Sequence, residues 1–261
     1  MPLIRHRIAI FLAVGFTAAA QDSDQLYQLG TRLFAQRQPA AALQALERSV
    51  ALKPSNAAAW KALGVVHAAQ GDFDLAEKPF RTACELQPAL ADACLYYGRT
   101  LYLLNRFQPA LGVLRRALTD DQRNSQIYRL IALSLEALGE TAEAGSAFQN
   151  AVRFDRRSPA NEHPGIDYGV YLFRQGQAEQ ALDPLERVLK RHPDASRAHL
   201  ELGCILLSLD RLSDAQLHLE RACALDPNSS RSHLLLGKVY LRLGKTEAAE
   251  EHLNQGSRTV K

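Results

Sequence analysis

The sequence predicts an all-α protein, a solenoid in which antiparallel helix pairs stack on one another. Three observations carry this prediction. Ala and Leu supply 40 and 42 of the 261 residues, whereas Ile and Val together supply only 17, and strands favour β-branched residues. Small residues recur at a spacing of 34 residues along most of the chain. Within each 34-residue unit, apolar residues follow the spacing of two successive helices.

Residues 1–20 have the pattern of a secretory signal peptide. A basic start with Arg5 and Arg7 precedes the apolar run 8–16, and an A-x-A site at Ala18 and Ala20 follows. The apolar run is shorter than the roughly 20 residues of a transmembrane helix. We therefore expect a bacterial protein that is periplasmic or secreted. The alternative is that this segment is retained as an uncleaved membrane anchor.

The repeat register accounts for residues 23–261. Alanine recurs every 34 residues, apart from one step of 37, at Ala42, Ala76, Ala110, Ala144, Ala181, Ala215 and Ala249. The longer step contains three inserted residues, 159–161. A fixed period of this length is the signature of a repeat architecture. We predict a single domain with seven repeats over residues 23–56, 57–90, 91–124, 125–158, 162–195, 196–229 and 230–261.

Each repeat is expected to contain two helices that pack through small residues. In the second repeat the first helix has a stripe at i, i+3, i+4 and i+7, formed by Trp60, Leu63, Gly64 and His67. A glycine then interrupts the pattern, and a second stripe is formed by Phe73, Ala76, Phe80 and Ala83. Pro88 ends the second helix, because proline cannot continue it. Gly64 and Ala76 allow the two helix backbones to approach each other closely.

These residues resemble the tetratricopeptide repeat, whose W…LG…Y…A…F…A…P pattern is matched by Trp60, Leu63, Gly64, Ala76, Phe80, Ala83 and Pro88. The resemblance covers residues 23–261. It implies a right-handed superhelical solenoid whose first helices line a concave groove that binds peptides or partner proteins. The fifth repeat departs from the pattern, since Gly165 follows His163 and Pro164 where a large residue belongs. Its first helix is therefore expected to begin late.

The candidate binding residues lie on the first helices, opposite the packed stripe. They occupy positions 2, 5, 9, 12 and 13 of a repeat, counted from its first residue. We assign to the partner-binding groove Arg99, Arg129, Phe173, Arg174, Arg197, Leu200, Leu207, Arg231, Leu234, Lys238, Leu241 and Arg242. Over all repeats these positions hold eight bases and three acids, with no acid from the fifth repeat onward.

This composition predicts that the groove of repeats five to seven binds an extended or helical protein segment that is acidic and has apolar anchors. The alternative is that some leucines pack against neighbouring helices and that the arginines only keep the surface soluble. Without residues 1–20, the chain carries 29 Lys and Arg against 28 Asp and Glu. This balance excludes a broad nucleic-acid-binding surface.

The four cysteines allow one disulfide. Cys84 ends one second helix and Cys94 begins the next first helix, on either side of the turn at Pro88. Export would permit a bond between them, and the alternative is two small buried residues at packing positions. Cys204 and Cys223 are expected to stay unbonded, because they lie at different heights on antiparallel helices. The sequence contains no C-x-x-C motif, so neither zinc binding nor thioredoxin-like chemistry is indicated.

The histidines repeat in the last two units without predicting a metal site. His199 and His233 share position 4, and His218 and His252 share position 23. Near-identity of the two repeats explains this recurrence, and the sequence shows no carboxylate-backed cluster with ligand spacing beside them. No metal and no cofactor are therefore expected. The sequence also lacks a P-loop, G-x-G-x-x-G, H-E-x-x-H and G-x-S-x-G, so we expect no enzymatic activity.

The sequence therefore predicts a non-catalytic, exported scaffold that binds a protein or peptide partner and no nucleic acid. Two alternatives stay open. One is a membrane-tethered accessory subunit of an envelope-assembly, pilus or polysaccharide-export complex, which would contact the membrane only through a retained N-terminal segment. The other is an accessory to a separately encoded enzyme such as a glycosyltransferase.

Overall fold

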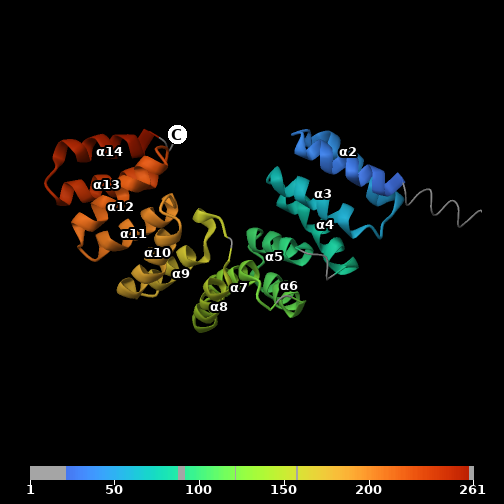
Figure 1. Cartoon of the computed structure of the whole chain (residues 1–261), viewed down its shortest axis with the longest axis horizontal. Helices are drawn as coiled ribbons and strands as arrows, with labels where there is room; N and C mark the ends of the chain where they lie inside the picture. The colour runs from blue at the N-terminus through green and yellow to red at the C-terminus, as the bar shows by residue number, and fades with distance from the viewer. Residues whose placement is uncertain (1–21, 88–91, 121, 157, 259–261) are drawn as a thin grey trace, which may run out of the picture. The chain divides into compact units, whose positions relative to one another are not determined.

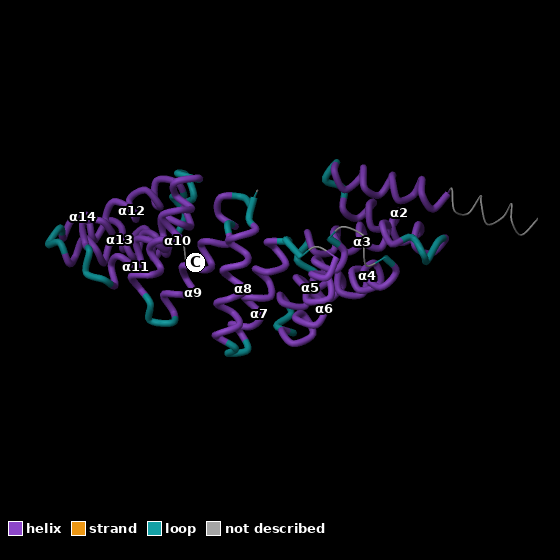
Figure 2. Tube along the Cα trace, turned by 60° about the horizontal axis from the view of Figure 1, so that its bottom comes forward, coloured by secondary structure: helices purple, strands orange, loops and turns teal. Residues whose placement is uncertain are grey.

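The computed structural model describes residues 22–87, 92–120, 122–156 and 158–258 (Figure 1). Within these ranges the regular elements are helices and no strand is present (Figure 2), so the all-α prediction is confirmed. The predicted signal peptide, residues 1–20, lies outside the described residues. None of the described helices combines the length and apolar character needed to cross a bilayer.

Packing divides the chain into two compact units. Among the described residues, the first contains those between 22 and 122 together with 137–139, and the second contains those from 123 to 136 and from 140 to 258. The helices of the first unit are residues 22–35, α2 (Pro39–Leu52), α3 (Ala57–Ala69), α4 (Phe73–Leu86), α5 (Ala93–Leu103) and α6 (Phe107–Asp120). From α2 onward each of these helices contacts the next one along the chain.

The second unit continues the same arrangement of helix pairs. Its helices are α7 (Ser125–Ala137), α8 (Thr141–Phe154), the short 3-10 helix η1 (Ala160–Glu162), α9 (Pro164–Arg174), α10 (Ala178–Arg191), α11 (Ser196–Ser208), α12 (Leu212–Leu225), α13 (Ser230–Arg242) and α14 (Thr246–Arg258). From α8 to α14 successive α-helices contact each other, and the first helices α9, α11 and α13 also touch in turn. The helix pairs of this unit therefore stack in sequence order. That residues 23–261 form one domain stays a prediction.

The turn inside each helix pair uses a left-handed residue at position 15 of the repeat. In four repeats this residue is a glycine with φ between 72° and 85°, at Gly71, Gly139, Gly176 and Gly244. Glycine adopts this conformation without a steric penalty. Asn105, Asp210 and Arg37 hold the same position with φ of 58°, 61° and 60°. The tight turn is thus imposed by the helix pair, since even an arginine accepts it.

The small residues of the register pack as the sequence predicts. All seven alanines that define the 34-residue spacing have 0% exposure. A Cβ atom added to Gly64 would lie 2.7 Å from the ring of Phe80, and one added to Gly203 would lie 2.6 Å from Cγ of Leu219. These distances are shorter than any normal carbon–carbon contact. Each glycine therefore lets the first helix approach a large core side chain of the second.

The fifth repeat begins late, as its sequence predicts. Two of the inserted residues, Ala160 and Asn161, lie in η1, and α9 starts only at Pro164. His163 precedes this helix, and its Nδ1 accepts a hydrogen bond of 3.0 Å from the backbone N–H of Gly165. Proline suits the first position of a helix because its missing N–H would have no partner there. The histidine ring and the proline together define the start of α9.

The cysteines take one of the two arrangements that the sequence leaves open. Cys84 on α4 and Cys94 on α5 form a disulfide, with their Cα atoms 4.8 Å apart. The bond joins the second helix of one repeat to the first helix of the next. Cys204 and Cys223 are both free thiols. Burial, with Asp226 and Glu220 nearby, raises the pKa of Cys223 to about 11.

Candidate functional site

The structure places the twelve predicted binding residues on first helices. Arg99 lies on α5, Arg129 on α7, and Phe173 and Arg174 on α9. The others lie on α11 and α13, namely Arg197, Leu200, Leu207, Arg231, Leu234, Lys238, Leu241 and Arg242. Because α9, α11 and α13 touch in turn, their residues form a shared surface within the second unit, called here the α9–α11–α13 surface.

The arginines of this surface are paired with carboxylates. Arg231 on α13 contacts Glu201 on α11 with two hydrogen bonds, Nη1 to Oε1 at 2.5 Å and Nη2 to Oε2 at 2.9 Å. The bond to Glu201 raises the pKa of Arg231. Arg174 Nη1 donates to Glu136 Oε1 at 3.1 Å.

Arg242 binds near the end of the preceding first helix. Its guanidinium donates to the Leu207 carbonyl at 3.2 Å and to the side chain of Asp210. Like Arg231, it therefore links α13 to the repeat before it.

Asp167 on α9 joins two further arginines. Its carboxylate is buried and accepts from Nε of Arg129 and, at 2.5 Å, from Nη2 of Arg197. Asn161, one of the inserted residues, supports this arrangement, because its Oδ1 accepts from the backbone N–H of Arg197 at 3.1 Å. The residue before α11, Ala195, has no side chain that can cap the helix. The insertion therefore supplies the cap and holds Arg197 beside Asp167.

These pairs correct the predicted charge of the groove. Positions 2, 5, 9, 12 and 13 hold no acid from the fifth repeat onward, but the acids that pair with the arginines stand at other positions. Asp167 and Glu201 occupy position 6, and Asp210 occupies position 15. In the second unit, four acids thus balance most of the six bases assigned to the groove. A recurrent signal marks two of the pairs, because Asp167 and Glu201 each precede their arginine by 30 residues.

Two of the predicted cations have no carboxylate partner among the described residues. Both Arg99 on α5 and Lys238 on α13 are exposed. Their charges are available to a partner, whereas those of the paired arginines are largely balanced.

The predicted leucines divide into packed and accessible side chains. Leu241 on α13 is 51% exposed, while Leu200 and Leu207 on α11 are half-buried. Leu234 packs against α14, since its Cγ lies 2.8 Å from the place that a Cβ on Gly256 would take. The alternative interpretation, packing between helices, thus holds for Leu234. Leu241 keeps the exposure that an anchoring contact requires.

A pocket in the first unit lies beside one of the predicted residues. Its volume is about 270 Å³, and α3, α4 and α5 form its walls through Val65, Ala68, Ala69, Phe73, Phe80, Tyr96, Arg99, Thr100 and Leu103. The rings of Phe80 and Tyr96 stack at 5.3 Å between centroids. The pocket is thus mainly apolar, with one exposed cation, Arg99, in its lining. The repeat register points to Arg99, whereas the pocket becomes visible only in the folded chain.

The chain matches tetratricopeptide repeat models over residues 27–91 and 169–230, and over 67–133 and 206–260. Among solved structures, a tetratricopeptide repeat protein from Parabacteroides merdae superimposes with a TM-score of 0.72 at 13% identity, covering 92% of this chain and 93% of that one. These matches agree with the stacked helix pairs.

Among curated proteins, the type IV pilus assembly protein PilF of Pseudomonas aeruginosa is 25% identical over 174 residues, which is 60% of this chain and 69% of that protein. A P. aeruginosa pilF structure superimposes with a TM-score of 0.66 at 20% identity, covering 82% of this chain and 96% of that one. The bovine BBSome complex member BBS4 is 22% identical over 58% of this chain, but the match spans only 35% of its own length.

Proposed function

Because the chain belongs to the tetratricopeptide repeat family, whose members mediate protein–protein interaction, we propose that it is a non-catalytic scaffold that holds a segment of a partner protein on its first helices. The family supports binding of a protein in general terms. The α9–α11–α13 surface supplies the more specific part of the proposal.

The proposal rests on two neighbouring side chains, an exposed apolar one and a cation for which the described part of the chain offers no carboxylate partner. Leu241 is 51% exposed on α13, and Lys238 lies on the same helix three residues earlier. Residues three apart are neighbours on a helix surface. A partner segment with an apolar anchor and an acidic residue next to it would satisfy both side chains. The paired arginines set the shape of this surface and add little net charge.

We further propose that the protein acts after export, in an assembly at the cell surface such as a pilus. The name of the similar P. aeruginosa protein, a pilus assembly protein, supports this setting. The disulfide between Cys84 and Cys94 also supports it, because disulfides persist in oxidising compartments such as the periplasm. Sequencing the N-terminus of the protein recovered from cell fractions separates a cleaved signal peptide from a retained anchor.

Site-specific photo-crosslinking tests the interaction surface. A photoreactive amino acid placed at Leu241 in the full chain, expressed in its own organism, should give a crosslinked product of defined mass. The matched control is Leu217 on the second helix α12, which is 65% exposed. Adding Lys238→Glu should reduce the product at position 241 at least severalfold. No product at position 241, or equal products at both positions, would overturn the proposal.

A further inference from the structure

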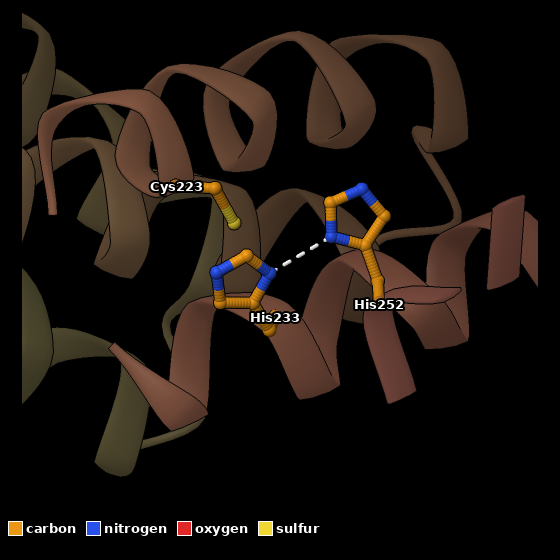
Figure 3. Close-up of side chains that lie close together, drawn as sticks. All are labelled: Cys223, His233 and His252. Atoms are coloured by element: carbon orange, nitrogen blue, oxygen red, sulfur yellow. Dashed lines mark hydrogen bonds between the residues drawn. The ribbon is translucent and has the colours of Figure 1, made fainter. Parts of the chain in front are cut away.

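Three side chains with metal-binding atoms converge in the second unit, and none of them is among the predicted binding residues. Cys223 lies on α12, His233 on α13 and His252 on α14, and one ligand atom from each lies within 4.8 Å of the other two. Figure 3 shows the Cys223 thiol and the His252 ring on different sides of His233, both directed toward its ring. Cys223 and His233 are buried and His252 is half-buried.

The hydrogen bonds of His233 direct one lone pair into this cluster. Its Nε2 lies 3.0 Å from the carbonyl oxygen of Pro227. Because a carbonyl only accepts, Nε2 carries the proton and Nδ1 carries the free lone pair. Nδ1 of His233 faces Nδ1 of His252 at 2.8 Å. A backbone carbonyl on the far nitrogen is the usual support of a metal-binding histidine.

The preceding repeat contains the same histidine pair without the thiol. Nδ1 of His199 lies 3.0 Å from Nδ1 of His218, and Nε2 of His199 lies 3.0 Å from the carbonyl of Pro193. The residue that corresponds to Cys223, 34 positions earlier, is Leu189. The histidine pair and its carbonyl are therefore common to both repeats. Only the later repeat adds a sulfur ligand, so the earlier one is a natural control.

The repeat register explains why Cys223 reaches His233. Both residues occupy the positions that Cys84 and Cys94 occupy earlier in the chain, position 28 of one repeat and position 4 of the next. Cys84 and Cys94 are close enough to form a disulfide. This pair of positions thus brings two side chains close together at more than one junction between repeats, as a disulfide at Cys84 and Cys94 and with ligand atoms within 4.8 Å at Cys223 and His233.

We propose that Cys223, His233 and His252 bind one zinc ion through Sγ and the two Nδ1 atoms, with water as the fourth ligand. Zinc favours tetrahedral sites of cysteine and histidine with bonds of roughly 2.0–2.3 Å, which separates the ligand atoms by roughly 3.3–3.8 Å. Rotation of the half-buried His252 widens the present 2.8 Å spacing of the two Nδ1 atoms. The thiol releases one proton, and His252 moves its ring proton from Nδ1 to Nε2. The bound ion joins α12, α13 and α14.

Metal titration of the full chain tests this site. The protein is first freed of metal with a chelator, under anaerobic conditions without reductant, so that Cys223 stays a thiol and the Cys84–Cys94 disulfide stays intact. It is then titrated with Zn²⁺ in competition with a chromophoric chelator. We expect one high-affinity Zn²⁺ per chain. Co²⁺ in place of Zn²⁺ should give a thiolate-to-cobalt charge-transfer band and the visible spectrum of a tetrahedral ion. Cys223→Ser and His252→Gln should each weaken Zn²⁺ binding at least roughly tenfold.

Two further variants make the test specific. His218→Gln changes the histidine pair that lacks a thiol and should leave Zn²⁺ binding unchanged. Leu189→Cys places a thiol beside His199 and His218, and we expect it to raise the stoichiometry from one Zn²⁺ to two. Absence of the cobalt charge-transfer band, or Zn²⁺ affinity unchanged in Cys223→Ser, would refute the site. Circular dichroism verifies that each variant is folded.

Discussion

Arg231 on α13 and Glu201 on α11 form a two-point ion pair between the first helices of neighbouring repeats, with N–O distances of 2.5 and 2.9 Å. The carboxylate is 10% exposed and the guanidinium 55% exposed. The pair is therefore well shielded on the acid side only. Such a contact aligns two helices in register and gives little net charge to the surface around it.

Loss of the Glu201 charge should destabilise the second unit. Glu201→Gln keeps the size of the side chain but replaces one acceptor oxygen by an NH₂ donor, so one of the two hydrogen bonds is lost and the other is weakened. We expect the free energy of unfolding to fall by about 1–3 kcal/mol. The control is Asp183→Asn, which breaks an exposed pair with Arg187 on one helix and should cost less than about 0.5 kcal/mol. Urea unfolding followed by circular dichroism measures both. Equal effects of the two substitutions would contradict a special role for Glu201.

Two glycines should respond in opposite ways to the same substitution. Gly203→Ala forces a Cβ to within 2.6 Å of Leu219 Cγ, and we expect a loss of about 1–3 kcal/mol from overpacking. Gly112 lies in α6, and a Cβ there would meet no atom within 4 Å. Gly112→Ala should therefore stabilise the protein by about 0.5–1 kcal/mol through better helix formation. Thermal unfolding of both variants shows whether each is more or less stable than the wild type. A Gly203→Ala protein as stable as the wild type would disprove the close-packing account.

Removing the disulfide should lower the stability of the first unit. The Cys84–Cys94 bond closes a loop with a sequence separation of 10 residues. Closing a loop of this size contributes about 2–3 kcal/mol by restricting the unfolded chain. Cys84→Ser with Cys94→Ser should shift the unfolding midpoint accordingly, and a reducing agent should shift the wild-type midpoint equally. Cys204→Ser, which removes a free thiol, is the control and should not alter the effect of the reducing agent.

Stability should fall as the pH drops below about 6.5. Burial lowers the pKa of His163, whose surroundings include Asp155, Arg191, His192 and Asp167. Burial also lowers the pKa of His199, which faces Arg221 and Asp194, and of His218, which faces His199 and Asp214. The folded protein binds these protons more weakly than the unfolded chain. Their contribution is thus fully present above pH 6.5 and is lost as the pH falls toward the lower folded values.

Melting temperatures between pH 7.5 and 5.5 measure this effect. His218→Gln keeps a donor for His199 but removes one titrating ring, so its melting temperature should depend less steeply on pH. A melting temperature that rises toward pH 5.5 would contradict the assigned direction of the pKa shifts.

The 34-residue register predicted the helix pairs because it depends on local size and periodicity. Ala76, Gly64 and the late start at Pro164 all follow from residues close in sequence. The register alone did not show which side chains meet across neighbouring repeats. Asp167 was therefore counted neither as packed nor as part of the groove, although it anchors Arg129 and Arg197.

The contacts between cysteine and histidine side chains were also not visible in the sequence. The sequence alone does not show that Cys223 and His233 meet, because two residues ten positions apart on different helices give no direct sign of contact. The disulfide between Cys84 and Cys94 indicates that they do meet, because both pairs occupy the same two positions of the repeat. Arg37 is a further case, because its left-handed conformation is set by the turn and is not favoured by an arginine.

The carboxylate of Asp167 has a mechanical consequence for the second unit. Through Arg129 and Arg197 it ties together α7, α9 and α11, and Arg231 extends the series to α13. If α13 detaches, the carboxylate of Glu201, which is only 10% exposed, loses its partner Arg231. Fraying of single repeats, the usual mode in linear arrays, is thereby suppressed. We therefore expect α7, α9, α11 and α13 to open together in hydrogen exchange, as one cooperative block.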